Sequence, residues 1–288
     1  MQNAILNEKR LAEAQAGWAA PTPPSPGGQV WAPPSTAPGA PVVPTTPITD
    51  GPVSTWQGAM TVGGTIAKTS VLFVILLAAA VAGWNATGGP EQLADGTYTY
   101  NFPGVALVGV AVGFIAVIAL MFRPQWAKFV APVYAVGQGF AVGAISRYYE
   151  TFFSGIVLQA AGATLGVFAV MLLLYQTRII KVTEKFRRVV VLATLGVMAF
   201  YLVSFVFALF GAEITFLREP NLLGIGFSIL VAGLAALNLT LDFDFIERGT
   251  KAGLAKDFEW YAGFGLLVTI VWLYLELLRL FALLQGRD

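Results

Sequence analysis

Four ionisable residues in the last fifty positions lie inside long apolar segments: Asp242, Asp244, Glu276 and Arg279. An ionisable side chain inside a membrane-spanning segment costs at least about 2.5–3.5 kcal/mol to insert, so it marks a functional site or an ion pair. Carboxylate oxygens are ligands for hard cations such as Ca²⁺, and a carboxyl group changes its charge with pH. These residues are therefore candidates for a functional site inside the membrane.

The spacing of the two aspartates separates their roles. Asn238 and Asp242 are four residues apart and share one face of a helix, whereas Asp244 points away from Asp242. For Asp242 we favour a functional position in the membrane interior, with Asn238 beside it. For Asp244 we weigh a place in the same ion pathway against a solvated helix end, where it would meet the headgroups with Glu247 and Arg248.

Glu276 and Arg279 are three residues apart, so they are expected to form an ion pair on one helix face. Counted from Trp260, Glu276 lies about 24 Å along the helix, beyond the centre of the membrane. The alternative is that Glu276 belongs to the ion pathway, together with Thr269 on the same helix. The spacing leaves both interpretations open.

The absence of two residue types excludes much enzyme chemistry. The sequence has no Cys and no His. A Ser–His pair, a thiolate nucleophile and a zinc-protease helix are therefore excluded, and the phosphate-binding motif GxxxxGK[ST] does not occur. We expect no catalytic residues, no metal site and no cofactor. The net charge of +1 also gives no reason to expect a nucleic-acid partner.

The composition predicts a membrane protein. Hydrophobic residues make up 57% of the 288 residues and charged residues only 11%, too few to coat a soluble fold. About 20 mostly apolar residues are needed for one helical crossing. Seven segments qualify, which predicts an all-α, polytopic seven-helix bundle: 69–85, 103–121, 129–146, 152–175, 189–210, 222–245 and 260–284.

The segment before the first predicted span has the composition of a disordered chain. Residues 20–64 are dominated by Pro, Gly, Ser and Thr, which cannot bury enough apolar surface to fold. The predicted domains are a disordered tail, 1–64, and a seven-helix transmembrane domain, 65–288.

Basic residues indicate the orientation in the membrane. With the tail inside, the inner side carries eleven of them: Lys68, Arg123, Lys128, Arg178, Lys181, Lys185, Arg187, Arg188, Arg248, Lys251 and Lys256. The outer side carries Arg147, Arg218 and Arg287. Basic loops stay in the cytoplasm. The bias predicts a cytoplasmic N-terminus, seven crossings and an extracytoplasmic C-terminus in the plasma membrane.

Glycine pairs four residues apart predict close helix packing. They are Gly109/Gly113, Gly139/Gly143 and Gly162/Gly166. Such pairs allow helix backbones to approach each other in a membrane. We expect them to lie at helix–helix interfaces.

Residues 60–284 resemble the actinobacterial branch of the Bax inhibitor-1 family. The resemblance is most specific in LNLTLDFDFIERG and in EWYAGFGLLVTIVWLYLELLRLFALL, and GGTIAKTSVLFVILLAAAVAGW fits the same branch. It implies seven helices, a cytoplasmic N-terminus and a pH-sensitive calcium leak gated by two aspartates on the last two helices. The first family aspartate matches Asp242, and the second matches Thr269, which is not acidic. Glu276 lies about 10 Å further along that helix.

On this resemblance, we expect a passive cation leak channel, with Ca²⁺ as the expected ion and the lipid bilayer as the other partner. The alternative is a non-conducting membrane protein that regulates a membrane protease or another membrane complex, a role that suits a long cytoplasmic tail of unidentified partner. A proton-coupled transporter would predict paired inverted repeats, and the sequence shows none.

Overall fold

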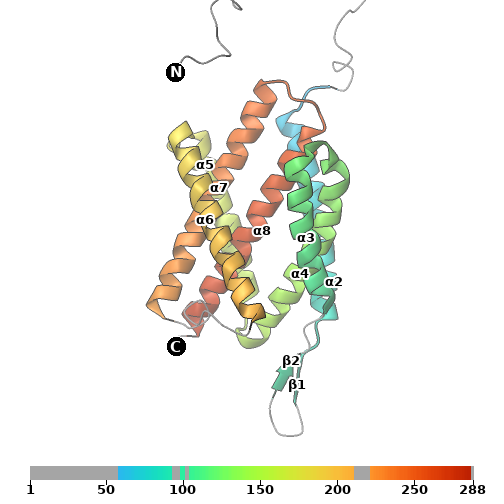
Figure 1. Ribbon diagram of the computed structural model, residues 1–288, viewed down its shortest axis with the longest axis vertical. Helices are drawn as coiled ribbons and strands as arrows, with labels where there is room; N and C mark the ends of the chain where they lie inside the picture. Colours follow the sequence, from blue (N-terminus) through green and yellow to red (C-terminus); the bar gives the residue numbers. More distant parts are fainter. Residues whose placement is uncertain (1–57, 93–97, 101–103, 211–220, 287–288) are drawn as a thin grey trace, which may run out of the picture. The chain divides into compact units, whose positions relative to one another are not determined.

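The computed structural model of the protein describes residues 58–92, 98–100, 104–210 and 221–286. Within these residues it contains seven long helices (Figure 1): α2 (Val62–Ala86), α3 (Gly104–Phe122), α4 (Ala127–Phe152), α5 (Ile156–Gln176), α6 (Glu184–Leu209), α7 (Leu222–Lys251) and α8 (Phe258–Gln285). A short 3-10 turn, η2 (Pro124–Trp126), links α3 to α4. Two three-residue strands, β1 (Pro90–Gln92) and β2 (Tyr98–Tyr100), pair antiparallel between α2 and α3.

All seven helices are long and apolar enough to cross a membrane, which confirms the predicted seven-helix, all-α membrane fold. Large apolar side chains are exposed on their outer faces, such as Val74 at 65%, Met121 at 71% and Leu158 at 79%. In water this surface would be unstable, whereas in a bilayer it faces lipid chains. The chain is a multi-pass membrane protein.

Several helices extend beyond the predicted apolar segments, notably α2, α4 and α7. The predicted break at 147–150 is wrong, because α4 continues through these residues to Phe152. The turn that follows is built by Gly155, which adopts φ 83°, and by the Glu150 carboxylate, which accepts hydrogen bonds from the backbone N–H groups of Gly155 (2.6 Å) and Val157 (3.1 Å). This carboxylate caps the first turn of α5.

The first helix begins within the predicted tail. Helix α2 starts at Val62, where the Thr61 hydroxyl accepts a hydrogen bond from Gly64 N at 2.9 Å. Met60 is buried, and its N–H donates to Leu254 O at 2.7 Å in the link between α7 and α8. The boundary at residue 64 is therefore too late. The rest of the predicted tail, residues 1–57, lies outside the described residues.

Helix α8 lies at the centre of the bundle, in contact with α2, α4, α5 and α7 (Figure 1). Helices α2 and α4 pack closely, because Gly143 has no side chain: a Cβ there would collide with the carbonyl group of Ala80. A Cβ at Gly139 would likewise collide with the carbonyl group of Leu76, and Gly109 packs against the backbone of α4. By contrast, a Cβ added at Gly162 or Gly166 would meet nothing within 4 Å, so this predicted pair does not lie at a helix–helix interface of the described residues.

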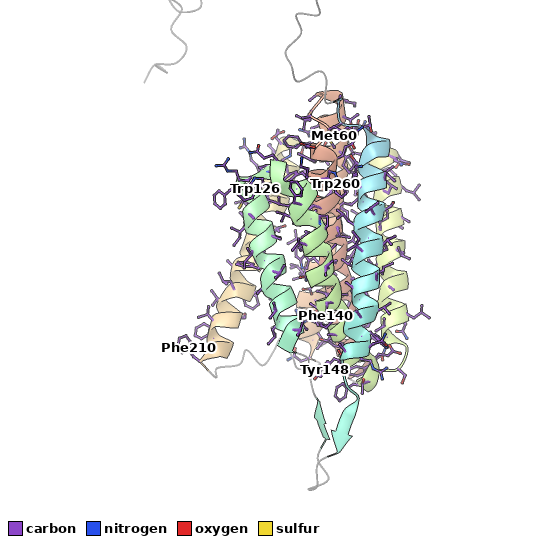
Figure 2. The ribbon with its side chains drawn as sticks, turned by 90° about the vertical axis from the view of Figure 1, so that its right-hand side faces the viewer. Met60, Trp126, Phe140, Tyr148, Phe210 and Trp260 are labelled. Atoms are coloured by element: carbon purple, nitrogen blue, oxygen red, sulfur yellow. The ribbon has the colours of Figure 1, made fainter. Side chains whose placement is uncertain are left out.

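The two ends of the bundle differ in charge. Figure 2 shows Met60, Trp126 and Trp260 at one end and Tyr148 and Phe210 at the other. The first end holds the start of α2 and the α3–α4, α5–α6 and α7–α8 links, with the eleven basic residues predicted for the inner side. We call it the basic end. At the opposite end, the described residues carry only Arg147 and Arg279 as basic side chains.

Candidate ion gate

The carboxyl group of Asp242 lies between α7 and α8. It faces Gly265, on which a Cβ would stand 3.5 Å from Asp242 Oδ1, and it hydrogen-bonds with the Thr269 hydroxyl. That hydroxyl also donates to Gly265 O at 3.1 Å. The second carboxyl oxygen, Oδ2, is buried without a hydrogen-bond partner. No basic side chain forms an ion pair with Asp242 in the part of the chain that the structure describes.

Asp242 and Thr269 lie at the same depth. Asp242 is about 13 Å from the end of α7 at Lys251, and Thr269 about 16 Å from the start of α8 at Phe258. The ionisable groups of neighbouring helices make their contacts elsewhere: Lys68 with Trp260, Tyr175 with Glu247, Arg187 with Asp244, Tyr261 with Phe245 and Glu276 with Tyr201. Asp242 is therefore an isolated carboxyl group well inside the bundle.

Asp244 faces α6 and is not a solvated helix end. Only 7% of the residue is exposed, and its carboxylate accepts from Arg187 Nη2 at 2.8 Å and Arg248 Nε at 2.9 Å. Both arginines also lie 3.5 Å from Glu184 Oε1. These four residues form a closed network of two positive and two negative charges, which joins the start of α6 to α7.

Glu247 and Asp244 do not meet the headgroups together, as one alternative expected. The Glu247 carboxylate instead accepts hydrogen bonds from Tyr175, from Arg178 at 2.7 Å and from Lys251 at 2.5 Å. Tyr175 and Arg178 come from the end of α5 and the link after it. Glu247 therefore ties α5 to α7, next to the network that ties α6 to α7.

Glu276 has Arg279 beside it and a further partner on α6. Arg279 Nη1 lies 3.7 Å from Glu276 Oε2. The Tyr201 hydroxyl donates to Glu276 Oε1 at 2.6 Å, and Arg279 donates to the same hydroxyl at 2.7 Å. Glu276 is 6% exposed and lies about 10 Å along α8 from Thr269. The structure does not bring it to Asp242.

Asn238 shares a helix face with Asp242 but is held by other groups. Its side-chain amide donates to the Thr194 hydroxyl on α6 at 2.8 Å and to Leu234 O at 2.9 Å. Within the described residues, the partner of Asp242 is thus Thr269 and not Asn238.

Several residues of these networks were missed from the sequence. Arg187 was assigned only to the membrane surface, and Tyr201 was not singled out. Glu259 is 1% exposed and accepts from Thr61 N at 3.1 Å and Thr61 Oγ1 at 3.0 Å, across 198 positions of sequence. No sequence spacing relates these partners. For Glu259, its position in the first turn of an apolar helix is the one available signal.

A comparison with known families adds to this geometry. The family model described as Bax inhibitor 1 like matches residues 4–286, which is nearly the whole chain. No curated protein matches the sequence.

Proposed function

The chain belongs to the Bax inhibitor-1-like family, and from that premise we propose that it is a passive, pH-sensitive cation leak channel, not an enzyme. Ca²⁺ is the proposed ion. Asp242 is the proposed gate, with Thr269 as its neighbour across the α7–α8 interface.

The observation that carries this proposal is the isolation of Asp242. Among the described intramembrane acids, Asp244 has two arginines and Glu276 has Arg279 and Tyr201, whereas Asp242 has one hydroxyl partner and no basic partner. Within the described residues, one carboxyl oxygen of Asp242 and one of Glu276 are buried without a hydrogen-bond partner. A buried carboxyl group without a counter-ion opposes stability, so a role in function explains its presence.

The two protonation states of Asp242 differ in what they attract. As a carboxylate it adds a negative charge and two oxygen ligands at the interface of α7 and α8, which suits a hard cation such as Ca²⁺. As a neutral carboxyl it can donate a hydrogen bond to Thr269 Oγ1 and hold the two helices together. A change in pH therefore changes both the attraction for the cation and the α7–α8 contact.

Calcium flux into liposomes tests the proposal. The full chain is reconstituted into vesicles that contain a Ca²⁺ indicator, and the initial rate of influx is measured between about pH 6 and 8. We expect a passive flux above that of protein-free vesicles, with a rate that depends on pH. A rate equal to that of empty vesicles at every pH would reject the channel proposal.

For orientation we propose a cytoplasmic N-terminus and an extracytoplasmic C-terminus in the plasma membrane. The support is the cluster of eleven basic residues at the end where α2 begins. A reporter fused near Gly51 should read cytoplasmic, and one fused after Asp288 extracytoplasmic. Both reporters on one side would contradict the proposed topology.

The second candidate is a non-conducting regulator of a membrane protease or another membrane complex. One contact favours it: Gly58, Ala59 and Met60, just after the tail, pair with the backbone of residues 254–256 between α7 and α8. A partner that holds the tail would thus act on the helices that carry Asp242 and Thr269. This candidate predicts no Ca²⁺ flux, and a phenotype on deletion of residues 2–55 even though the truncated protein still folds.

A further inference from the structure

A groove lies between α2 and α5, and α4 and α8 form its floor. It is separate from the proposed gate at Asp242. Its volume is about 700 Å³. The walls are almost entirely hydrocarbon, from Leu77 and Val81 on α2 to Ala161 and Leu165 on α5. Leu77, Val81 and Leu165 are 49%, 61% and 62% exposed, so the groove opens toward the bilayer.

The few polar groups in the groove already have partners. Ser146 Oγ lies 2.7 Å from the Tyr274 hydroxyl, and the Thr164 hydroxyl donates to Ala160 O at 2.7 Å. A water molecule needs two to four polar partners, and this surface offers few. The groove therefore suits an apolar occupant.

The length of the groove matches one leaflet of a membrane. Its α2 wall runs from Phe73 to Trp84, a rise of eleven residue steps or about 16 Å at 1.5 Å per residue. This is about half of the roughly 30 Å hydrocarbon core. Trp84 lies two residues before the end of α2, and Val157 lies in the first turn of α5, so the groove begins at the opposite end of the bundle and stops near the middle.

A positive charge lies beside the Trp84 end of the groove. Arg147 follows Ser146 on α4, and its guanidinium carbon lies 5.2 Å from the centre of the Trp84 ring. Glu150, the nearest acid on α4, is engaged by the backbone of the α4–α5 turn, and Arg147 forms no salt bridge within the described ranges. A guanidinium group beside a Trp at the membrane interface is a suitable site for a phosphate group.

We propose that this groove is a phospholipid site: one acyl chain of a lipid in the leaflet at the opposite end fills it, and the lipid phosphate binds Arg147 beside Trp84. The charge of Arg147 complements the phosphate, and the length of the groove fits a chain that hangs from that leaflet. The proposal does not depend on the proposed channel activity.

Photo-crosslinking in vesicles tests the site. The full chain is reconstituted with phosphatidylglycerol that carries a photoreactive group near the middle of one acyl chain, and labelled peptides are mapped by mass spectrometry. We expect labels concentrated on the groove walls of α2 and α5. Phosphatidylglycerol should label more strongly than diacylglycerol with the same chain, since only the former has a phosphate for Arg147. Equal labelling by both, or labelling spread evenly over all lipid-facing helices, would overturn the proposal.

Two variants separate the chain site from the phosphate site. Ala161→Phe places a ring in the groove and should remove the α2 and α5 labels, whereas Ala169→Phe makes the same change on an exposed position of α5 outside the groove and should leave them. Arg147→Gln should weaken retention of phosphatidylglycerol about tenfold, as expected for loss of one charge-assisted contact. Retention is read from lipid adducts in native mass spectra of folded protein. Unchanged retention in both Ala161→Phe and Arg147→Gln, or a different bound molecule in the wild-type protein, would refute the lipid assignment.

Discussion

Asp242 and Asp244 lie two residues apart on α7 but occupy different environments. Asp244 faces α6, where Arg187 and Arg248 contact its carboxylate. Asp242 faces α8, where its contact is the Thr269 hydroxyl and one carboxyl oxygen has no hydrogen-bond partner among the residues that the structure describes. Helix α6 presents an arginine to α7, whereas α8 presents a hydroxyl group. Two carboxyl groups on one helix can therefore serve different purposes.

The comparison separates acids that contact cations from Asp242, the proposed gate. Asp244 and Glu247 join α7 to α6 and α5 at the basic end, and Glu276 joins α8 to α6 through Tyr201. Their removal is expected to lower stability. Asp242 contacts no cation among the described residues, so its removal is expected to change function without lowering stability.

The largest expected loss of stability follows Glu276→Gln. The Arg279 guanidinium, whose side chain is 18% exposed, would lose the charge of the Glu276 carboxylate, a change that costs up to about 3 kcal/mol for buried ion pairs. Unfolding in detergent measures it. The matched control is Glu184→Gln, where the side chain is 66% exposed and the expected loss is below about 1 kcal/mol.

We also expect Glu276→Gln to keep the pH profile of Ca²⁺ flux. If the variant instead loses the pH dependence of Ca²⁺ flux and keeps its stability, Glu276 belongs to the gate.

A smaller loss is expected for Asp244→Asn. The variant removes the charge that faces two arginines, whose side chains are 38% and 46% exposed and therefore partly solvated. Loss of charged hydrogen bonds of this kind costs about 1.5–3 kcal/mol. The control is Asp257→Asn, before the first turn of α8, which should leave the midpoint of unfolding unchanged. If the two variants unfold alike, the network of Asp244 contributes nothing to stability.

The seven spans, the family and the position of Asp242 were accessible from the sequence, whereas most partners were not. Apolar segments mark the hydrocarbon region, but helices continue past it, which is why 147–150 was mistaken for a turn. The contact of Asp244 with Arg187 joins residues 57 positions apart, and such a pairing depends on how α6 packs against α7. Thr269 was located by the resemblance alone, and its contact with Asp242 places these two positions together.

The sharpest expected effect on titration, rather than on stability, belongs to Thr269→Asp. It restores the second aspartate that the family resemblance implies and places two carboxyl groups in contact. Two coupled carboxyl groups release their protons in two macroscopic steps, so the pH profile of Ca²⁺ flux should gain a second step. Thr269→Asn, which is polar but uncharged, serves as the control and should keep one step. An unchanged profile in Thr269→Asp would show that position 269 does not interact with the gate.

The pH profile of Asp242→Asn tests the central claim most directly. The substitution keeps the shape of the side chain and removes its ability to titrate. We expect liposomes with this variant to show Ca²⁺ influx that no longer changes between about pH 6 and 8, while Asp244→Asn keeps the wild-type dependence. If the influx through Asp242→Asn follows the wild-type pH profile, Asp242 is not the gate.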